Sequence, residues 1–378
     1  MKKLLFLLSM LPAMLNAQPK PPSTYDLLIG TYTQNGSEGI YVYRFYTESG
    51  RLAYLNRTTG IDNPSYLCVS KNGKFVYSVN EVGDDRKGSV TAFTFEPKVG
   101  TINPINKQVS GAGPCYISVD KDQKHVFTAN YAGGSMYVFP VNKDGSLSPA
   151  SQILQDKPEG LGTDRARQDK PHVHTAMLSP DEKHLIYTDL GTDRLNIYKY
   201  KSSQPQPLTP ATPDFVKITP GDGPRHIEFS TNRKYLYAIT EMGGNIISYN
   251  YNNGQPKQIQ TISMLSDGSK QKAGGADIHV SPDGLFLYAS NRGDANEIIV
   301  YAINQETGLL TFIERQSSRG NHPRNFTIDT SGSFLLVANQ KSNNIVVFKI
   351  NRTTGKLTLV RINTEVDSPT CLKFTAAE

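Results

Sequence analysis

The sequence predicts an all-β fold, a seven-bladed β-propeller with four antiparallel strands per blade. Three observations predict it: a repeated hairpin pattern, a third apolar segment after each hairpin, and one further unit divided between the two ends of the chain. The composition agrees, with 20 Tyr, 31 Gly, 23 Pro and no Trp among 378 residues. Such a composition suits short strands joined by tight turns better than it suits helical bundles.

The repeated unit is eighteen residues long and occurs six times without a gap. Each copy has an alternating apolar segment, a polar turn such as KNG, PDG or TSG, and a second alternating segment, which is typical of a β-hairpin. The copies are PSYLCVSKNGKFVYSVNE (64–81), PCYISVDKDQKHVFTANY (114–131), VHTAMLSPDEKHLIYTDL (173–190), PRHIEFSTNRKYLYAITE (224–241), GADIHVSPDGLFLYASNR (275–292) and PRNFTIDTSGSFLLVANQ (323–340). Repetition of this kind indicates an array of similar structural units.

A third apolar segment, partly aromatic, follows each copy, as in SVTAFTF or NIVVFKI, and a fourth usually follows a turn such as TGKL. The units recur every 46 to 59 residues. Four strands in such an interval are typical of one propeller blade.

The seventh blade is predicted to be shared by the two ends of the chain. Residues 27–57 carry the second, third and fourth strand patterns, whereas residues 369–375 (PTCLKFT) carry a first strand pattern with nothing after it. Pairing them closes the ring and removes the sheet edges that invite aggregation. We therefore predict one propeller domain over residues 25–378.

The N-terminal segment has the pattern of a secretory signal peptide, because Lys2 and Lys3 precede an apolar run and Ala17 follows it. The run of about twelve residues is too short to span a bilayer. We predict a signal peptide over residues 1–17, a short linker over 18–24, and a protein exported to the periplasm or beyond the cell without membrane insertion.

The charge gives no sign of a nucleic-acid partner. The formal net charge of +6 falls to +4 without Lys2 and Lys3, and no Lys/Arg cluster or aromatic ladder is present. The three cysteines, an odd number, lie in predicted strands. We interpret Cys68, Cys115 and Cys371 as buried free thiols.

Chemically unlike residues occupy equivalent positions at one rim of the predicted propeller. In a blade the first strand lines the central channel, and its start meets the end of the second strand. The residues one step into the first strands are Ser65, Cys115, His174, Arg225, Ala276, Arg324 and Thr370. Those ending the second strands are Tyr32, Glu81, Tyr131, Leu190, Glu241, Arg292 and Gln340. A purely structural position would carry similar residues in every copy.

A cluster of His174, Arg225, Glu241, Arg292 and Arg324 is expected at the channel mouth, because these residues come from four consecutive blades. Buried arginines must be paired or hold an anion, and one glutamate does not neutralise three guanidiniums. The pattern therefore predicts a pocket for a carboxylate, a phosphate or a lactone oxygen. One structural alternative stays open, in which Arg225 or Arg324 binds backbone carbonyls between blades.

An insertion, KPEGLGTDRARQDKPHVH (157–174), lengthens one interval between units to 59 residues. It is expected to bring Arg167, Gln168 and His172 to the same rim as His174, since long loops on rigid scaffolds often carry function. His226 and His279 are interpreted instead as core histidines. The Asn or Asp that recurs just before the second-strand ends is interpreted as a turn cap.

The motifs RQDKPHVH, GDGPRHIEF with AITE, GADIHVSPDGLFLYASNR and NHPRNFTIDTSG resemble the lactonase family of seven-bladed propellers. That family includes bacterial 6-phosphogluconolactonases and fungal carboxymuconate-lactonizing cyclases. The resemblance covers nearly the whole predicted domain and implies opening or closure of a lactone ring without a metal or organic cofactor. It assigns the family's proposed site residues to His174, Arg225, Glu241 and Arg292, with Arg324 in an equivalent PR motif.

Lactone hydrolysis needs an activated water and stabilisation of the oxyanion that forms at the carbonyl. Because no G-x-S-x-G motif is present, we expect direct attack by water rather than an acyl-enzyme. His174 or Glu241 is the expected general base, and Arg225 the expected oxyanion stabiliser. The residues expected to bind substrate are Arg292, Arg324, Arg167, Gln168 and His172.

The expected partner is a small lactone, and predicted export favours an unphosphorylated sugar lactone over a cytoplasmic sugar phosphate. Two other functions stay open. A propeller without catalytic activity would bind a glycan or a protein at its rim, and a cycloisomerase would use the same arginines on a dicarboxylate without consuming water.

Overall fold

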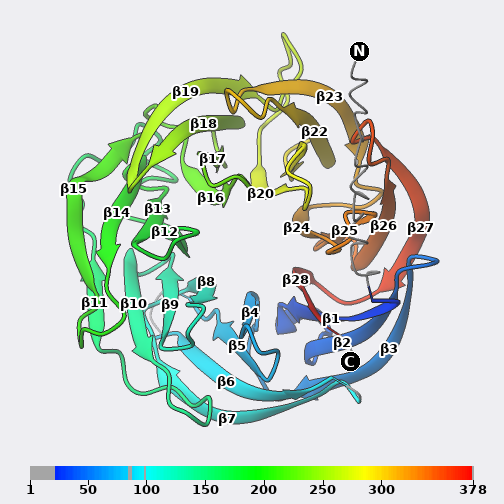
Figure 1. The fold of residues 1–378 in the computed structure, drawn as a ribbon, viewed down its shortest axis with the longest axis horizontal. Helices are drawn as coiled ribbons and strands as arrows, with labels where there is room; N and C mark the ends of the chain where they lie inside the picture. Colours follow the sequence, from blue (N-terminus) through cyan, green and yellow to red (C-terminus); the bar gives the residue numbers. More distant parts are fainter. Residues whose placement is uncertain (1–21, 84–86, 98, 377–378) are drawn as a thin grey trace, which may run out of the picture.

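Residues 22–83, 87–97 and 99–376 are described by the computed structural model, and they form seven four-stranded antiparallel sheets around a central axis (Figure 1). The predicted all-β, seven-bladed propeller is thereby confirmed. In each sheet the strand that starts the hairpin repeat lies nearest the axis, and the fourth strand lies outermost.

The strands are given blade by blade, from the axis outward. The first three blades contain β28 (Pro369–Ala376), β1 (Thr24–Thr31), β2 (Gly39–Tyr46) and β3 (Arg51–Thr59); β4 (Leu67–Val69), β5 (Phe75–Asn80), β6 (Ser89–Glu96) and β7 (Thr101–Val109); β8 (Pro114–Val119), β9 (His125–Asn130), β10 (Ser135–Pro140) and β11 (Gln152–Gln155). The next two contain β12 (Val173–Leu178), β13 (His184–Asp189), β14 (Arg194–Tyr200) and β15 (Leu208–Lys217); β16 (Pro224–Phe229), β17 (Tyr235–Thr240), β18 (Asn245–Asn252) and β19 (Gln255–Ser263). The last two contain β20 (Gly275–Val280), β21 (Phe286–Asn291), β22 (Glu297–Ile303) and β23 (Leu310–Ser317); β24 (Pro323–Ile328), β25 (Phe334–Asn339), β26 (Asn344–Ile350) and β27 (Leu357–Glu365). One 3₁₀ turn, η1 (Thr33–Asn35), follows β1.

The two ends of the chain share one blade, as predicted. β28 pairs antiparallel with β1, from Tyr25 opposite Ala376 to Thr31 opposite Pro369. Leu372 lies opposite Ile29, and both side chains are almost completely buried. This pairing closes the ring of blades.

The hairpin turn of each repeated unit is held by a side chain at the end of its first strand. The residues are Ser70, Asp120, Ser179, Ser230, Ser281 and Asp329, and each accepts a hydrogen bond of 2.6–3.1 Å from the backbone N–H five residues later. Ser and Asp favour turns through such local side-chain bonds. The polar turn of the repeat therefore sets the register of both strands that flank it.

The Asn or Asp before each second-strand end holds the loops of the rim, which confirms its interpretation as a turn cap. Asp189 Oδ1 accepts hydrogen bonds from the N–H groups of His172 and Gly191, at 2.7 and 2.9 Å. Asn291 Oδ1 accepts them in the same way from Gly274 and Gly293, at 3.0 Å each. These bonds fasten the loops from which site residues project.

The three cysteines are free, and Cys115 and Cys371 are buried while Cys68 is half-buried. The predicted signal peptide lies outside the described residues. Within the described part of the chain, no helix is long and apolar enough to cross a membrane.

Replacing Leu372 with Ala tests the closure of the ring. The substitution leaves a cavity in the apolar cluster that contains Ile29 of β1 and Leu336 of the neighbouring blade, and we expect it to lower the free energy of unfolding by about 2–5 kcal/mol. Leu309→Ala, at a leucine that is 39% exposed, should change it by no more than about 0.5 kcal/mol. Urea unfolding of both variants measures the difference, and equal losses would contradict this role of β28.

Candidate active site

A β-bulge at the start of six innermost strands decides which side chains face the channel. The pairing of β28, β8, β12, β16, β20 and β24 with their neighbours shifts register within the first few residues. Successive residues of a regular strand point to opposite faces, and a bulge re-aims them. In β16 the shift lies between Pro224 and Ile227, and the side chains of Arg225 and His226 come within 3.4 Å of each other.

The channel mouth collects most of the site residues predicted from the sequence. His174, Arg225 and Arg324 lie at the bulged starts of β12, β16 and β24. Glu241 and Arg292 directly follow the ends of β17 and β21, at the same rim. The repeat thus brings residues far apart in the chain to one place.

Glu241 lies at the centre of three guanidinium groups. Its Oε1 accepts a hydrogen bond of 2.5 Å from Arg167 Nη2, and its Oε2 lies 2.8 Å from Arg292 Nη2 and 3.2 Å from Arg225 Nε. The Arg225 contact is Coulombic only, because its buried Nε has no partner with hydrogen-bond geometry. Burial favours protonation of Glu241, but the guanidiniums outweigh it and hold its pKa well below the usual value.

A second carboxylate at the mouth, Glu81, was not among the residues selected from the sequence. Its Oε2 accepts hydrogen bonds from Tyr32 Oη at 2.9 Å and from Ser65 Oγ. Arg324 Nη2 lies 4.0 Å from the same oxygen, and the Arg324 guanidinium carbon lies 5.2 Å from the centroid of the Tyr32 ring. A sequence signal existed, since Glu81 ends its repeated unit at the place where Glu241 ends another.

These side chains enclose a cavity of about 210 Å³. It is lined by Tyr32, Glu81, Cys115, Tyr131, Arg167, His174, Glu241, Arg292 and Arg324. A wider cavity of about 560 Å³ shares Arg167, Glu241 and Arg292 with it. Another, of about 360 Å³, adjoins it at Tyr32 and Glu81. The mouth therefore offers a small, highly charged centre between two wider spaces.

Arg225 lies behind the cavity wall, which corrects the expectation that its side chain faces the channel mouth. The residue is 2% exposed, and its Nη1 donates a hydrogen bond of 2.5 Å to the backbone oxygen of Ala276. Burial lowers its pKa to about 9, and Arg292 and Arg324 act in the same direction. Because its Nε contacts Glu241, Arg225 supports that carboxylate from behind the cavity wall. Its bond to Ala276 agrees with the alternative left open from the sequence, in which Arg225 binds backbone carbonyls between blades.

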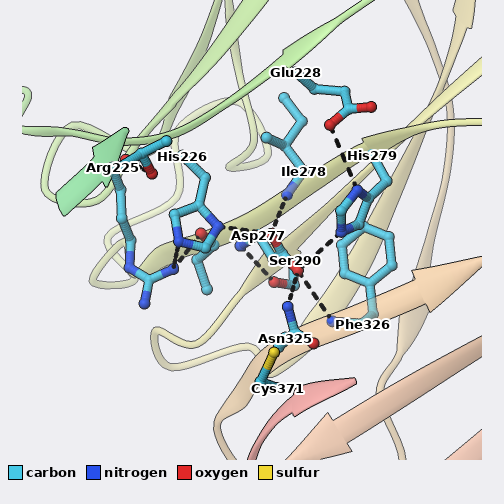
Figure 2. A network of polar contacts seen from close by, with 12 residues as sticks. Arg225, His226, Glu228, Asp277, Ile278, His279, Ser290, Asn325, Phe326 and Cys371 are labelled. Atoms are coloured by element: carbon cyan, nitrogen blue, oxygen red, sulfur yellow. Dashed lines mark hydrogen bonds and ion pairs between the residues drawn. The ribbon is translucent and has the colours of Figure 1, made fainter. Parts of the chain in front are cut away.

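Figure 2 shows the buried polar network that continues from Arg225 along the channel. Asp277 Oδ1 lies 2.7 Å from His226 Nδ1, and its Oδ2 lies 3.1 Å from His279 Nε2, while His279 Nδ1 lies 3.6 Å from a Glu228 oxygen. Burial lowers the pKa of His226 to about 3, so this imidazole is neutral at pH 7. Burial opposes ionisation of His279 as well, but Asp277 and Glu228 raise its pKa to about 10. The interpretation of His226 as a core histidine with a satisfied partner is confirmed, whereas His279 is only half-buried and its ring nitrogens face two carboxylates.

Aromatic rings pack together next to this network. The rings of Tyr66 and Tyr116 stack with centroids 4.5 Å apart, and His226 meets both edge-on at 5.7 and 5.5 Å. His174 contacts His226 edge-on at 5.2 Å. The rings therefore form a floor beneath the cavity.

His174 supplies the imidazole of the cavity wall. Burial, followed by the charge of Arg225 and other nearby cations, lowers its pKa well below the usual value, so it is neutral at pH 7. Its Nδ1 is buried without a hydrogen-bond partner. A neutral imidazole offers one donor and one acceptor, and this one has capacity left for a ligand.

Arg167 is the residue that the insertion loop contributes to the cavity. Besides its bond to Glu241, its Nη2 donates to Tyr131 Oη at 3.4 Å, and its side chain is 46% exposed. The side chain therefore reaches over the mouth from solvent to the buried carboxylate.

The structure does not bring Gln168 or His172 into the cavity wall, contrary to the expectation that they bind substrate. Gln168 is fully buried, and its Nε2 donates to Leu190 O at 2.9 Å and to Asp193 Oδ2 at 2.8 Å. The His172 ring stacks on Tyr131, with centroids 4.4 Å apart. Both residues hold the insertion loop, so they position Arg167 and Tyr131 and have no free polar group facing the cavity.

The site carries more positive than negative charge. Three arginines in the wall and Arg225 behind it face two carboxylates, Glu81 and Glu241, and four minus two leaves two positive charges. Cations withdrawn from water need an anionic partner. The arrangement therefore suits a ligand that is negative or becomes negative during a reaction.

A larger cavity, of about 640 Å³, lies at the turn between β4 and β5. Its charged lining residues are Lys71, Lys74 and Glu96, side chains typical of a solvated surface. Among the described residues, no group of three or more His, Cys, Asp or Glu is placed to hold a metal ion. We place the candidate site at the channel mouth, where buried charges converge.

Fold and site together define a seven-bladed propeller with an arginine-rich pocket at one mouth of its channel. The family described as "Lactonase, 7-bladed beta-propeller" matches residues 26–374, and the chain belongs to this lactonase family.

Relatives with assigned names are similar over most of their length. A 6-phosphogluconolactonase of Bacillus subtilis (strain 168) is 38% identical over 350 residues, which cover 92% of this chain and 97% of the relative. A 6-phosphogluconolactonase of Formosa agariphila is 37% identical over 320 residues, covering 84% and 90%. The solved structure of a Pseudomonas aeruginosa periplasmic gluconolactonase has a TM-score of 0.89 at 36% identity, covering 94% of this chain and all of that one.

Replacing Glu241 with Gln tests whether this carboxylate holds the arginines together. We expect a loss of about 3–5 kcal/mol in the free energy of unfolding at pH 7, because three guanidiniums lose a buried charged partner. The depressed pKa adds stability above the unfolded value of 4.5, and that stability is lost as the pH falls below it.

The free energies of unfolding of wild type and Glu241→Gln should therefore differ less at pH 4 than at pH 7. Urea unfolding at both pH values measures it, with the exposed Glu306→Gln as control. A loss below about 1 kcal/mol at pH 7, as for a surface ion pair, would contradict the assignment.

Proposed function

We propose that the protein is an enzyme that hydrolyses a sugar lactone by direct attack of water. The observation that carries the proposal is the surplus of guanidinium charge around a small cavity that also holds a neutral histidine. Lactone hydrolysis places negative charge on the carbonyl oxygen in the transition state and on the product carboxylate, and preorganised cations stabilise both. The family and the names of the relatives support the same chemistry.

Oxyanion stabilisation falls to Arg292 and Arg324 in this proposal, because both line the cavity. Arg225 acts indirectly, through its contact with Glu241. Glu241 is a poor general base, since three guanidiniums engage its two oxygens and keep it ionised. Its role is to hold the arginines in place, and the imidazole of His174 hydrogen-bonds the substrate.

The proposed substrate is an aldonolactone such as glucono-δ-lactone. The signal-like N-terminal segment favours an exported enzyme and an unphosphorylated substrate. If the substrate carries a phosphate, the wider cavity of about 560 Å³ offers Lys272 and Arg292 for it. Cell fractionation of the full-length protein tests export, and recovery of the intact chain in the cytoplasm would contradict it.

Lactone opening by the purified chain from Gln18 onward tests the proposed activity. Glucono-δ-lactone, 6-phosphogluconolactone and a muconolactone are compared by pH change, after subtraction of spontaneous opening. We expect turnover of a sugar lactone that His174→Ala abolishes while the fold is retained. Formation of a muconolactone from a dicarboxylate would indicate a cycloisomerase instead, and inactivity on every compound a binding propeller.

Arg292→Ala should lower kcat/KM for the active lactone about 10²–10³-fold, because it removes a donor aimed at the developing oxyanion. Arg165→Ala changes an exposed arginine of the insertion loop and provides the matched control, with an expected change of less than about twofold. Equal activity of the two variants would contradict the role assigned to Arg292.

A further inference from the structure

We propose that Glu81 is the general base that activates the attacking water. This inference rests on the proposed lactone hydrolysis and assigns the proton-transfer step within the same site. Glu81 lines the central cavity together with His174 and the three wall arginines. The sequence offered His174 and Glu241 for this step, and the structure gives each of them an environment that weakens it as a base.

The two carboxylates of the cavity have different surroundings. Glu241 is bound by three guanidiniums at 2.5–3.2 Å, and both of its oxygens are engaged. Among the residues that the structure describes, Glu81 has one guanidinium within reach, that of Arg324 at 4.0 Å. A carboxylate bound by three cations loses their favourable interaction when it accepts a proton, which makes Glu241 a poor base. The geometry therefore leaves Glu81 as the carboxylate of the cavity whose oxygens are not enclosed by guanidiniums.

Glu81 is oriented by neutral donors that leave one of its oxygens available. Tyr32 Oη and Ser65 Oγ both donate to Oε2. No described residue bonds to Oε1, and Oε1 is not among the buried polar atoms without a partner. The two hydroxyls therefore fix the plane of the carboxylate, while Oε1 keeps its lone pairs for a water in the cavity.

The position of Glu81 also suits the next stage of the reaction. Arg324 lies close to Glu81 and lines the same cavity, so the base and an oxyanion donor are neighbours. Acyl transfer requires both groups within reach of one carbonyl. His174 and Arg292 complete the wall around that point.

The step balances with water as the second reactant. Glu81 Oε1 takes one proton from water as the water oxygen bonds to the lactone carbonyl carbon, and the carbonyl oxygen becomes an oxyanion beside Arg292 and Arg324. When the carbonyl re-forms, the bond between that carbon and the ring oxygen breaks. The ring oxygen receives the proton from Glu81 and becomes a hydroxyl, and the product acid ionises in solution.

Four variants test this assignment on the lactone that the wild type hydrolyses best. Glu81→Gln should lower kcat about 10²–10⁴-fold with KM changed less than about threefold, since the amide accepts no proton from water. Glu81→Ala should regain at least about tenfold of its lost rate in added formate, a small carboxylate that fits the vacated space. Glu241→Ala should show no rescue by formate, because its loss disperses the arginines, and Glu306→Gln should behave as wild type.

Binding of the hydroxy-acid product, measured by calorimetry, shows whether the pocket survives. Unchanged product affinity in Glu81→Gln with the expected loss of kcat supports the assignment. Activity of Glu81→Gln within about threefold of wild type overturns it. The assignment is also overturned if Glu81→Gln loses product binding in parallel with activity and formate does not rescue Glu81→Ala. Either result leaves the lactonase proposal intact, whereas a wild-type chain inactive on every lactone overturns both.

Discussion

The register shift at the start of the innermost strands is the constraint on which the arrangement of the channel depends. A strand without it would send alternate residues to opposite faces, and the channel would receive one side chain where it now receives two. With the bulge in β16, the side chains of Arg225 and His226 lie on the same side of the strand, within 3.4 Å of each other. One of them supports the charges of the mouth, and the other packs with Tyr66 and Tyr116 in the floor beneath.

The guanidiniums at the mouth are stable because the carboxylates of Glu241 and Glu81 offset part of their charge, while a net positive charge remains. A buried guanidinium is unfavourable alone, and Glu241 satisfies three of them at once. That arrangement makes Glu241 a structural anion. It also leaves Arg324 with Glu81 as its carboxylate partner, 4.0 Å away. The surplus charge is thus concentrated where a ligand can reach it.

The network beneath the mouth keeps these groups in place. Asp277 accepts from His226 and faces the charged His279, so the neutral His226 presents its other nitrogen to Arg225 (Figure 2). Buried polar networks are rigid when every member is satisfied. Arg225 must be held rigidly if it is to support Glu241 from behind the cavity wall. The network that holds it comes from three innermost strands, β16, β20 and β24.

The sequence by itself determined the blades, their closure and the rim, because an eighteen-residue repeat with a local turn bond in each copy specifies the hairpins wherever it occurs. His174, Glu241, Arg292 and Arg324 could be selected for the same reason, since equivalent repeat positions reach one rim. Only the tertiary structure decided that Arg225 lies behind the wall, that Gln168 is turned into its own loop, and that Glu81 shares the cavity. Those outcomes depend on bulges and on partners from other blades, such as Ala276 for Arg225 and Asp193 for Gln168. The residue pattern of a single strand does not indicate which group from a distant part of the chain will bond to a buried side chain.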